Sequence, residues 1–293
     1  MYNKAVKDPR CVLRKMIAMG FFKWMPDKPY LELAYYAHFG KKLDLKAPKT
    51  FNEKLQWLKL YDRNPEYTRM VDKYEAKQYV AEKIGEEYII PTLGVWDNPD
   101  QIDFDALPDQ FVLKCTHDSG GLVICRDKSR LNIEEAKEKL KKRLKFMYFY
   151  WGREWPYKNV KPRVIAEKYM EDESGTELKD YKVMCFEGEP KLIQVHRGRF
   201  GEHTQDFYDT QWQKLEITQG FPYSETKMDR PVFLEEMLTL SKKLSQNLHQ
   251  VRVDWYYVEH QLYFGELTFF DGAGFDGFEP DEYDEIIGSW IKI

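Results

Sequence analysis

The feature that most restricts the fold of this chain is a pair of strand-like segments near its C-terminus. The first covers residues 251–258 and reads VRVDWYYV, and the second covers residues 262–268 and reads LYFGELT. Two segments rich in β-branched and aromatic residues, joined by so short a connection, predict an antiparallel hairpin. We expect a three-residue turn at 259–261, which would place Val258 opposite Leu262.

The same register brings acidic side chains together. Counting back from the turn puts Asp254 opposite Glu266 and Arg252 opposite Thr268. Two acids on one face repel each other, and a divalent cation between them removes the repulsion. Magnesium suits this place because it prefers oxygen ligands and is often held by one or two carboxylates and substrate phosphates. Arg252 could reach a transferring phosphoryl group, although an ordinary acidic surface hairpin neutralised by Arg252 remains the alternative.

A second element is a hairpin with a glycine-rich tip. Residues 111–116 and 122–125 have the composition of strands, and DSGG at 118–121 joins them. Lys114 lies near the end of the first strand, so its ammonium group and the backbone N–H groups of the tip could converge on phosphate oxygens. A turn beside a lysine is also common in proteins that bind nothing. That alternative stays open for this segment alone.

A third element is the segment VIAEKYM at residues 164–170, which predicts a strand that leads into a polar connection. The backbone at a strand end can face the edge of an adenine ring. Acidic residues in the connection, here Glu177 and Asp180, can bind ribose hydroxyl groups.

The rest of the chain predicts an α+β protein. Thr50 stands three residues before Glu53, which is the pattern of a capping box and predicts a helix through Leu60. Further helices are expected at 69–84, 132–145 and 232–248, and further strands at 181–186 and 191–195. A chain of 293 residues fits one body with two interlocked lobes.

Composition argues against several classes of function. The net charge of −4 argues against nucleic acid as a partner. The four cysteines show no CxxC spacing, which predicts reduced thiols in a cytoplasmic protein without structural zinc. No stretch approaches the ~20 apolar residues of a membrane span.

Two segments leave a surface role open. The apolar run at residues 16–25 is interrupted by Lys23 and is interpreted as a helix, with peripheral contact to a membrane as the alternative. The basic run KKRLK at 141–145 precedes aromatic residues at 146–151. It could face a polyanionic acceptor or an anionic membrane, or it could be the solvated face of a helix.

Taken together and in this order, the three elements resemble the ATP-grasp superfamily, and within it the TupA-like branch of teichuronopeptide synthesis. The resemblance extends from about residue 40 to the C-terminus. The runs that carry it are FNEK at 51–54 with Trp57, DKY at 72–74, residues 111–121, DYK at 180–182, RVD at 252–254 and GELT at 265–268.

The resemblance implies an α+β ATP-grasp fold in which two α+β lobes grip the nucleotide. Its expected parts are a helical N-terminal segment at 1–68, a first lobe with the glycine-rich loop at 69–162, and a second lobe with the adenine and metal sites at 163–293.

The resemblance also implies a set of residues that bind ATP. They are Lys73 or Lys77 as the first ATP lysine, Lys114 as the second, Ser119, Gly120 and Gly121 as the phosphate-covering loop, Glu167, Lys168 and Met170 at the adenine, and Asp180 or alternatively Glu177 at the ribose.

A further implied set carries the chemistry. Asp254 and Glu266 match magnesium ligands, Arg252 matches the arginine that steadies a phosphorylated intermediate, and Lys182 would lie near the phosphates with Lys114. Many ATP-grasp ligases have an asparagine two residues after the second acid as a further metal ligand. This chain has Thr268 there, whose hydroxyl group can bind magnesium or a metal-bound water.

The activity that the resemblance implies is an ATP- and Mg²⁺-dependent ligation of a carboxylate to an amine through an acyl phosphate. The expected substrates are a carboxylate-bearing sugar or amino acid and an amine, joined on a uronic-acid-containing capsule or cell-wall polysaccharide precursor in the cytoplasm, with the inner face of the membrane as a further option. Aromatic residues at 148–157 and the segment 196–199 could line an acceptor groove.

Three other functions remain open. A glycosyltransferase of the same pathway would favour a DxD run after a strand, and the one such run, at 103–105, follows no convincing strand. An ATP-grasp kinase would transfer phosphate to a hydroxyl group. A non-catalytic module would bind acidic glycan without ATP.

Overall fold

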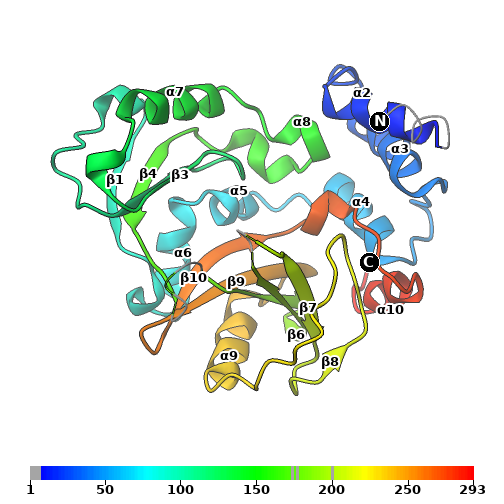
Figure 1. Ribbon diagram of the computed structural model, residues 1–293. Coiled ribbons are helices and arrows are strands. Elements are labelled where there is room, and N and C mark those ends of the chain that lie inside the picture. The colour runs from blue at the N-terminus through cyan, green and yellow to red at the C-terminus, as the bar shows by residue number, and fades with distance from the viewer. Residues whose placement is uncertain (1–7, 173–174, 176–177, 199–200) are drawn as a thin grey trace.

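Two antiparallel sheets organise the chain, and they face each other across the middle of the molecule (Figure 1). The computed structural model describes residues 8–172, 175, 178–198 and 201–293. Each sheet carries a helix on the side that faces away from the other sheet, α7 (Ile133–Leu144) on the smaller sheet and α9 (Leu234–Leu244) on the larger one. The expected α+β architecture with two lobes is confirmed.

The smaller sheet contains the glycine-rich hairpin and has the strand order β1-β4-β2-β3. Its strands are β1 (Thr92–Trp96), β2 (Phe111–Cys115), β3 (Leu122–Cys125) and β4 (Val164–Lys168). Leu140 of α7 packs with Phe111 and Leu113 in the core of this lobe. Strand β4 pairs with both β1 and β2, so it belongs to this sheet although it follows residue 163. The lobe boundaries at 68/69 and 162/163 remain a prediction.

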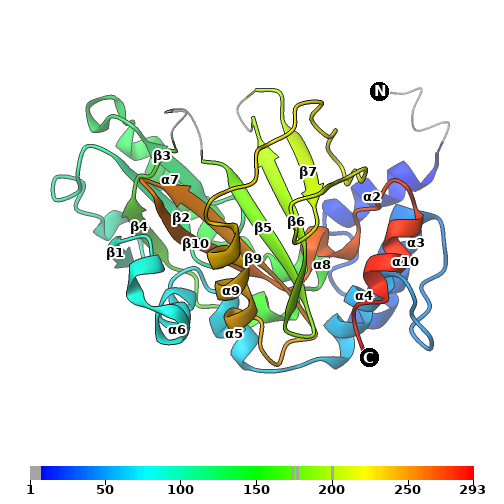
Figure 2. The ribbon, with the colours of Figure 1, turned by 90° about the horizontal axis from the view of Figure 1, so that it is seen from below.

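The larger sheet has the order β10-β9-β5-β6-β7-β8. Its strands are β5 (Asp180–Phe186), β6 (Glu189–Arg197), β7 (Thr204–Tyr208), β8 (Lys214–Leu215), β9 (Gln250–Val258) and β10 (Gln261–Thr268). Helix α9 crosses its outer face (Figure 2), and Trp255 of β9 donates a 2.8 Å hydrogen bond to the Ser241 hydroxyl on that helix. Because side chains alternate along a strand, Arg252 and Asp254 face the other sheet.

The remaining helices lie around and between the sheets. They are α2 (Arg10–Ala18), α3 (Asp27–Phe39), α4 (Phe51–Tyr61), α5 (Glu66–Val71), α6 (Glu75–Ile84), α8 (Phe149–Gly152) and α10 (Glu282–Gly288), with short 3₁₀ turns η1 (Glu86–Tyr88), η2 (Pro99–Gln101), η3 (Lys128–Arg130), η4 (Trp155–Asn159) and η5 (Asp271–Gly274). The helix interpreted at 16–25 ends already at Ala18, where a turn at Gly20 follows with a φ of 79°. Within the described part of the chain, no helix has the length and apolar character needed to cross a membrane.

The single helix expected at 69–84 is wrong, because the chain forms two helices there. Asp72 lies between them, and its Oδ1 accepts two backbone hydrogen bonds at the start of α6 while its Oδ2 accepts one from Arg163 at 2.8 Å. A carboxylate in this position begins a new helix. The backbone N–H of Lys73 donates to the Thr116 carbonyl at 3.1 Å, so the break holds Lys73 beside the end of β2.

The capping box predicted for α4 is confirmed. The Thr50 side chain accepts a hydrogen bond from the Glu53 backbone, and the Glu53 side chain returns to the Thr50 backbone. Asn52, which is fully buried, donates from Nδ2 to the Asp276 carbonyl and to Asp284 Oδ1, both at 3.0 Å. The FNEK run therefore joins α4 to the C-terminal segment.

We predict that Thr50→Ala lowers the free energy of unfolding by about 1 kcal/mol, because it leaves a backbone N–H at the start of α4 without its acceptor. Urea unfolding followed by circular dichroism measures this change. The matched control is Thr239→Ala, which makes the same substitution at an exposed position inside α9. Equal stability of Thr50→Ala and the wild type would show that the cap is unimportant.

Candidate functional site

A groove between the two sheets contains most of the candidate residues. Two pockets form it, and both are lined by Lys114, Leu122, Glu167 and Tyr256. One pocket is mainly apolar and lies against β2, β3 and β4. The other is mainly polar and reaches from the glycine-rich tip to β10. The groove therefore has an apolar end and a polar end that meet at Lys114 and Glu167.

A buried ion pair marks the point where the two ends meet. Glu167 of β4 lies 2.5 Å from the Nζ atom of Lys77 through Oε1 and 2.5 Å from the Nζ atom of Lys114 through Oε2. Burial raises the pKa of Glu167, but the two ammonium groups outweigh it and lower this pKa to about 2. Burial lowers the pKa of Lys77, and Glu167 partly offsets that effect. One carboxylate thus holds two lysines side by side.

The apolar end is lined mainly by aliphatic side chains. Met170 is buried and packs with Ile90 and Val258. Lys168 is exposed and also lines this pocket, and its backbone N–H donates to the Pro91 carbonyl at 3.0 Å. Apolar walls with a few polar groups are the usual surroundings of a bound aromatic ring.

The glycine-rich tip forms one wall of the polar end. Ser119 and Gly121 line the pocket together with Glu266 of β10. A Cβ atom at Gly121 would lie 2.6 Å from the Cys115 Sγ, so the tight return of the chain requires glycine there. A Cβ atom at Gly120 would lie 2.5 Å from the guanidinium of Arg143.

Arg143 of α7 anchors this tip. It forms an ion pair with Asp118, which is buried, and its Nε donates to Asp118 Oδ2 at 2.5 Å. In the same basic run Lys141 pairs with Asp100 at 2.8 Å. The run at 141–145 is therefore only partly a solvated helix face, because one of its cations fixes the glycine-rich loop.

The turn of the C-terminal hairpin differs from the sequence-based expectation. Val258 pairs with Gln261, so the turn contains only Glu259 and His260, with φ values of 49° and 66°. Positive φ at both central residues is the geometry of a two-residue type I′ turn, which follows the twist of the strands. The predicted three-residue turn is wrong by one residue.

A β-bulge compensates for the shorter turn. The register shifts between Phe264 and Leu267, so that Gly265 and Glu266 together lie opposite Asp254. Thr268 then pairs with Arg252, as the sequence predicts. The bulge thus returns the acidic residue of β10 to the face that carries Asp254.

Arg252 is the centre of an ion-pair network that adjoins the polar end through Glu266. It is buried, and its Nε and Nη2 lie 2.7 Å from the two oxygens of Asp254. The same Nη2 atom lies 3.2 Å from Glu266 Oε1 and 3.1 Å from the Thr268 hydroxyl, and Nη1 forms a close ion pair with Asp271. Burial lowers the pKa of Arg252, but Asp254 and Asp271 raise it well above its ordinary value.

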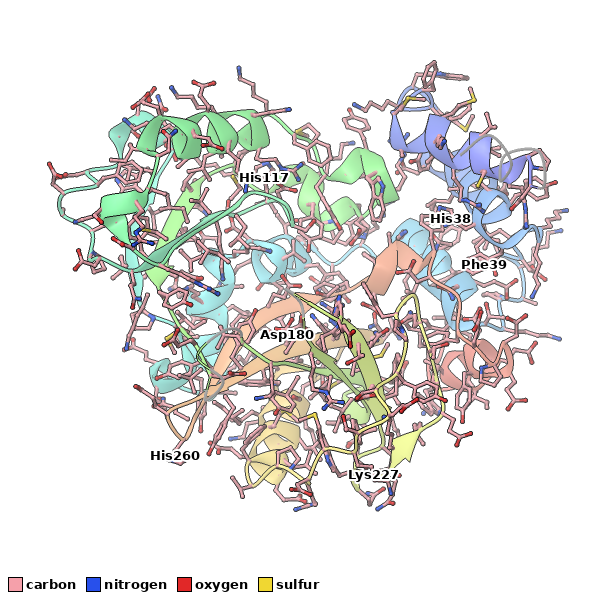
Figure 3. The ribbon with its side chains drawn as sticks, viewed as in Figure 1. His38, Phe39, His117, Asp180, Lys227 and His260 are labelled. Atoms are coloured by element: carbon pink, nitrogen blue, oxygen red, sulfur yellow. The ribbon has the colours of Figure 1, made fainter. Side chains whose placement is uncertain are left out.

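Two lysines complete the charge balance around these acids. Lys182 of β5 forms a close ion pair with Asp254 and lies 3.6 Å from Asp180 Oδ2. Asp180 is the first residue of β5 and lies near the middle of the molecule (Figure 3). Lys73 lies 3.1 Å from Glu266 Oε2. Burial raises the pKa of Glu266, but Lys73, Arg252 and Lys182 outweigh it and leave the pKa well below its ordinary range.

No signal in the sequence points to two members of this network. Asp271 lies in η5, after β10, and Gln194 of β6 donates to its Oδ2 at 3.1 Å. Gln194 also donates to Gln219 at 3.2 Å. An acid in a loop and a glutamine in a strand have many ordinary roles, so only the fold reveals that they support Arg252.

The aromatic segment at 148–157 reaches the glycine-rich tip. Tyr148 interacts with both Ser119 and Glu154, and burial raises the pKa of Tyr148 well above its ordinary value. Burial also raises the pKa of Glu154, to about 7. This segment therefore borders the polar end, where an acceptor groove was expected.

Other expected residues lie elsewhere. In the segment 196–199, Arg197 forms a close ion pair with the buried Asp206, and Arg199 lies outside the described residues, as does Glu177. In the DxD run, Asp103 accepts the backbone hydrogen bonds of a turn, and Phe104 is buried under α7.

The oxygens around Arg252 suit a divalent cation. One Arg252 nitrogen contacts both Asp254 and Glu266, with the Thr268 hydroxyl beside them, so these oxygens are the candidate ligands of a divalent cation. Among the residues described, no group of three or more His, Cys, Asp and Glu side chains could hold a metal ion. Two carboxylates completed by phosphate oxygens match the preference of magnesium rather than that of a metal caged by protein.

A family model described as TupA-like ATPgrasp matches residues 53–292. Comparison with curated proteins gives no match.

Solved structures of ligases are similar to this chain. They include a D-alanine–D-alanine ligase from Bacillus anthracis complexed with ATP (16% identity, 68% of this chain and 53% of that chain, TM-score 0.39), a D-alanine–D-alanine ligase from Helicobacter pylori (14%, 83% and 69%, 0.42) and a phosphoribosylamine–glycine ligase from Thermotoga maritima (12%, 69% and 48%, 0.42). The chain spans about half the length of the Bacillus anthracis ligase.

We predict that His196, on the same face of the larger sheet, makes folding sensitive to acid. Burial, then Lys182, Arg252 and His203, lower the pKa of His196 to about 3, while Asp271 opposes them. Below pH 6.5 His196 is protonated in the unfolded chain but stays neutral in the folded chain. The free energy of unfolding therefore falls as the pH falls. Between pH 7 and pH 5, His196→Gln should lose about 2 kcal/mol less than the wild type.

Urea unfolding at both pH values measures this difference. The control is His260→Gln, which changes an exposed histidine of the hairpin turn. An unchanged pH dependence in His196→Gln would contradict the prediction.

Proposed function

Because the chain belongs to the TupA-like ATP-grasp family, we propose that it binds ATP in the groove between its sheets and uses it to join a carboxylate to an amine. The observation that carries the proposal is the contact of one Arg252 nitrogen with both Asp254 and Glu266. This contact brings two carboxylates and a guanidinium group together at β10, beside the polar end of the groove.

The two ends of the groove divide the nucleotide between them. The apolar end, with Met170 and the exit of β4, receives the adenine, and Asp180 binds the ribose. Lys77 and Lys114 lie where the two ends meet, each 2.5 Å from Glu167. In this proposal their ammonium groups pair with phosphate oxygens. Lys73 and the tip from Ser119 to Gly121 lie further toward the terminal phosphate.

Asp254 and Glu266 hold magnesium in this proposal, with Thr268 as a further oxygen donor. Bound there, the ion offsets phosphate charge and aligns the terminal phosphate. The ion pair with Asp254 holds the ammonium group of Lys182 on the face of the larger sheet where the phosphates are proposed to bind. Asp254 holds the planar guanidinium of Arg252 on the same face.

The proposed reaction has two steps. An oxygen of the substrate carboxylate attacks the γ-phosphorus, the bond to the bridging oxygen of ADP breaks, and an acyl phosphate forms. The amine then attacks the acyl carbon, phosphate leaves, and the amine nitrogen loses a proton. Arg252, Lys182 and Lys114 offset the negative charge that develops, and positioning supplies much of the remaining rate enhancement.

The proposal extends to the substrates. The TupA-like character of the chain favours an amino acid or amine joined to a uronic-acid-containing precursor of a capsule or cell-wall polysaccharide, made in the cytoplasm. The aromatic segment at 148–157 beside Ser119 is the proposed acceptor side, because aromatic rings stack on sugars.

We predict that Asp254→Asn lowers ADP formation at least about 100-fold, because the variant loses a carboxylate of the proposed magnesium site and the charge that orients Arg252 and Lys182. A mass-spectrometric screen of uronic-acid-containing sugars, amino acids and ATP first identifies the pair that gains the mass of a condensation product. ADP release with that pair is then measured for the variant.

The matched control is Asp105→Asn, which tests the DxD run at an exposed site. Loss of activity only in this control would favour a glycosyltransferase. ADP formation with a hydroxyl acceptor and no amine would favour a kinase. Normal turnover by a folded Asp254→Asn variant would refute the metal assignment.

We predict that Lys114→Met weakens binding of ATP about tenfold or more, because a charge-assisted contact to phosphate is lost. Titration calorimetry with ATP and magnesium measures the affinity. Lys139→Met, which removes an exposed lysine of α7, is the control. Binding of acidic glycan but not of ATP by the wild type would favour the non-catalytic module.

A further inference from the structure

A segment that follows α2 exposes large apolar side chains beside lysines. Met19, Phe21 and Trp24 are 66%, 58% and 78% exposed. Their neighbours Phe22 and Met25 instead pack against the core formed by α2 and α3. The segment is thus anchored through one set of apolar side chains and presents another set to solvent.

Hydrogen bonds fix this arrangement. The Nη2 atom of Arg153, a residue that is buried, donates to the carbonyl oxygens of Phe22, Lys23 and Met25 at 3.2, 3.1 and 3.0 Å. Arg153 follows α8, which lies beside α2 and α3 in Figure 1. Trp151 of α8 is also exposed, and its carbonyl accepts a 2.8 Å hydrogen bond from α3. These hydrogen bonds hold the backbone of the segment in place, and the side chains of Phe21 and Trp24 remain exposed.

The charge of this region is opposite to that of the chain. Residues 8–36 contain five cations and three acids, a net charge of +2, whereas the whole chain carries −4. Asp8 is paired with Arg10 and Arg14. The exposed lysines here have no ion pair with any residue that the structure describes; they are Lys15, Lys23 and Lys28.

We propose that this surface docks on a lipid bilayer that carries anionic headgroups. The N-terminal docking surface, as we call it, comprises Met19, Phe21, Trp24, Lys15, Lys23 and Lys28. Its apolar side chains would enter the boundary between headgroups and acyl chains, where tryptophan is favoured, while its lysines pair with lipid phosphates.

Charge and geometry favour a bilayer over a second copy of the chain. A two-fold interface built from this surface would gather the unpaired lysines of both copies in one shared patch, where like charges repel. Docking also leaves the apolar end of the nucleotide groove open, because α2 lies at the opposite end of the molecule from β1 and the tip of the β9–β10 hairpin (Figure 1).

Sedimentation of the full chain with vesicles tests the proposal. One set of vesicles is phosphatidylcholine alone, and the other contains about one-third phosphatidylglycerol. The wild type should sediment with the anionic vesicles at least about tenfold more strongly than with the neutral ones, and added salt should reduce this binding. Phe21→Ser/Trp24→Ser and Lys15→Glu/Lys23→Glu should each lose about tenfold or more.

Two controls keep the result specific. Val232→Ser removes an apolar side chain that is exposed elsewhere, and Lys227→Glu reverses a charge far from α2 (Figure 3). Both controls should bind like the wild type, and all variants should unfold at the wild-type temperature. Failure of the wild type to bind anionic vesicles overturns the proposal, as does wild-type binding by both docking variants. A change in oligomeric state in Phe21→Ser/Trp24→Ser without vesicle binding would assign the surface to a second copy.

Discussion

The buried guanidinium of Arg252 is the interaction on which the rest of the site depends. It is held among Asp254, Glu266 and Asp271, which lie on the successive elements β9, β10 and η5. A charge removed from water is tolerated only when partners surround it, and removal of one partner leaves the others uncompensated. On the inner face of the larger sheet, the charges of these acids and cations therefore depend on one another.

This balance links distant segments to the groove. Lys59 of α4 is buried and donates to the carbonyls of Ala273 in η5 at 2.6 Å and of Gly152 at 2.7 Å. Burial lowers the pKa of Lys59 to about 7, and Glu154 partly offsets this effect. Since Asp271 begins η5, the FNEK helix helps to fix one of the acids that hold Arg252. Electrostatic preorganisation of this kind needs a rigid frame around the charges.

Short-range patterns in the sequence were sufficient for much of the fold. The capping box at Thr50, the strand pairs and the facing of Arg252 and Thr268 all follow from local spacing. The hairpin shows the limit of such reasoning, because the turn is one residue shorter than expected and the bulge at Gly265 restores the register. Neither feature can be read from alternation alone. Asp271 and Gln194 could not be predicted either, because only the fold places Asp271 on Arg252 and Gln194 on Asp271.

The break at Asp72 illustrates the same limit in a helical region. Helical periodicity continues through residues 69–84, but the carboxylate accepts hydrogen bonds at the start of α6 and from Arg163, which follows more than ninety positions later. Tertiary contacts thus override the local helix propensity at Asp72, and the break places Lys73 beside the groove. The departures at Asp72 and in the C-terminal hairpin both lie at the proposed site, as expected where function constrains geometry.

The most direct test of this account is a crystal structure with a non-hydrolysable ATP analogue and manganese, read through the anomalous signal of the metal. We predict a manganese peak bonded to oxygens of Asp254 and Glu266, with the adenine against Met170 and the phosphates beside Lys77 and Lys114. Manganese away from both carboxylates, or a nucleotide outside the groove between the sheets, would contradict the account.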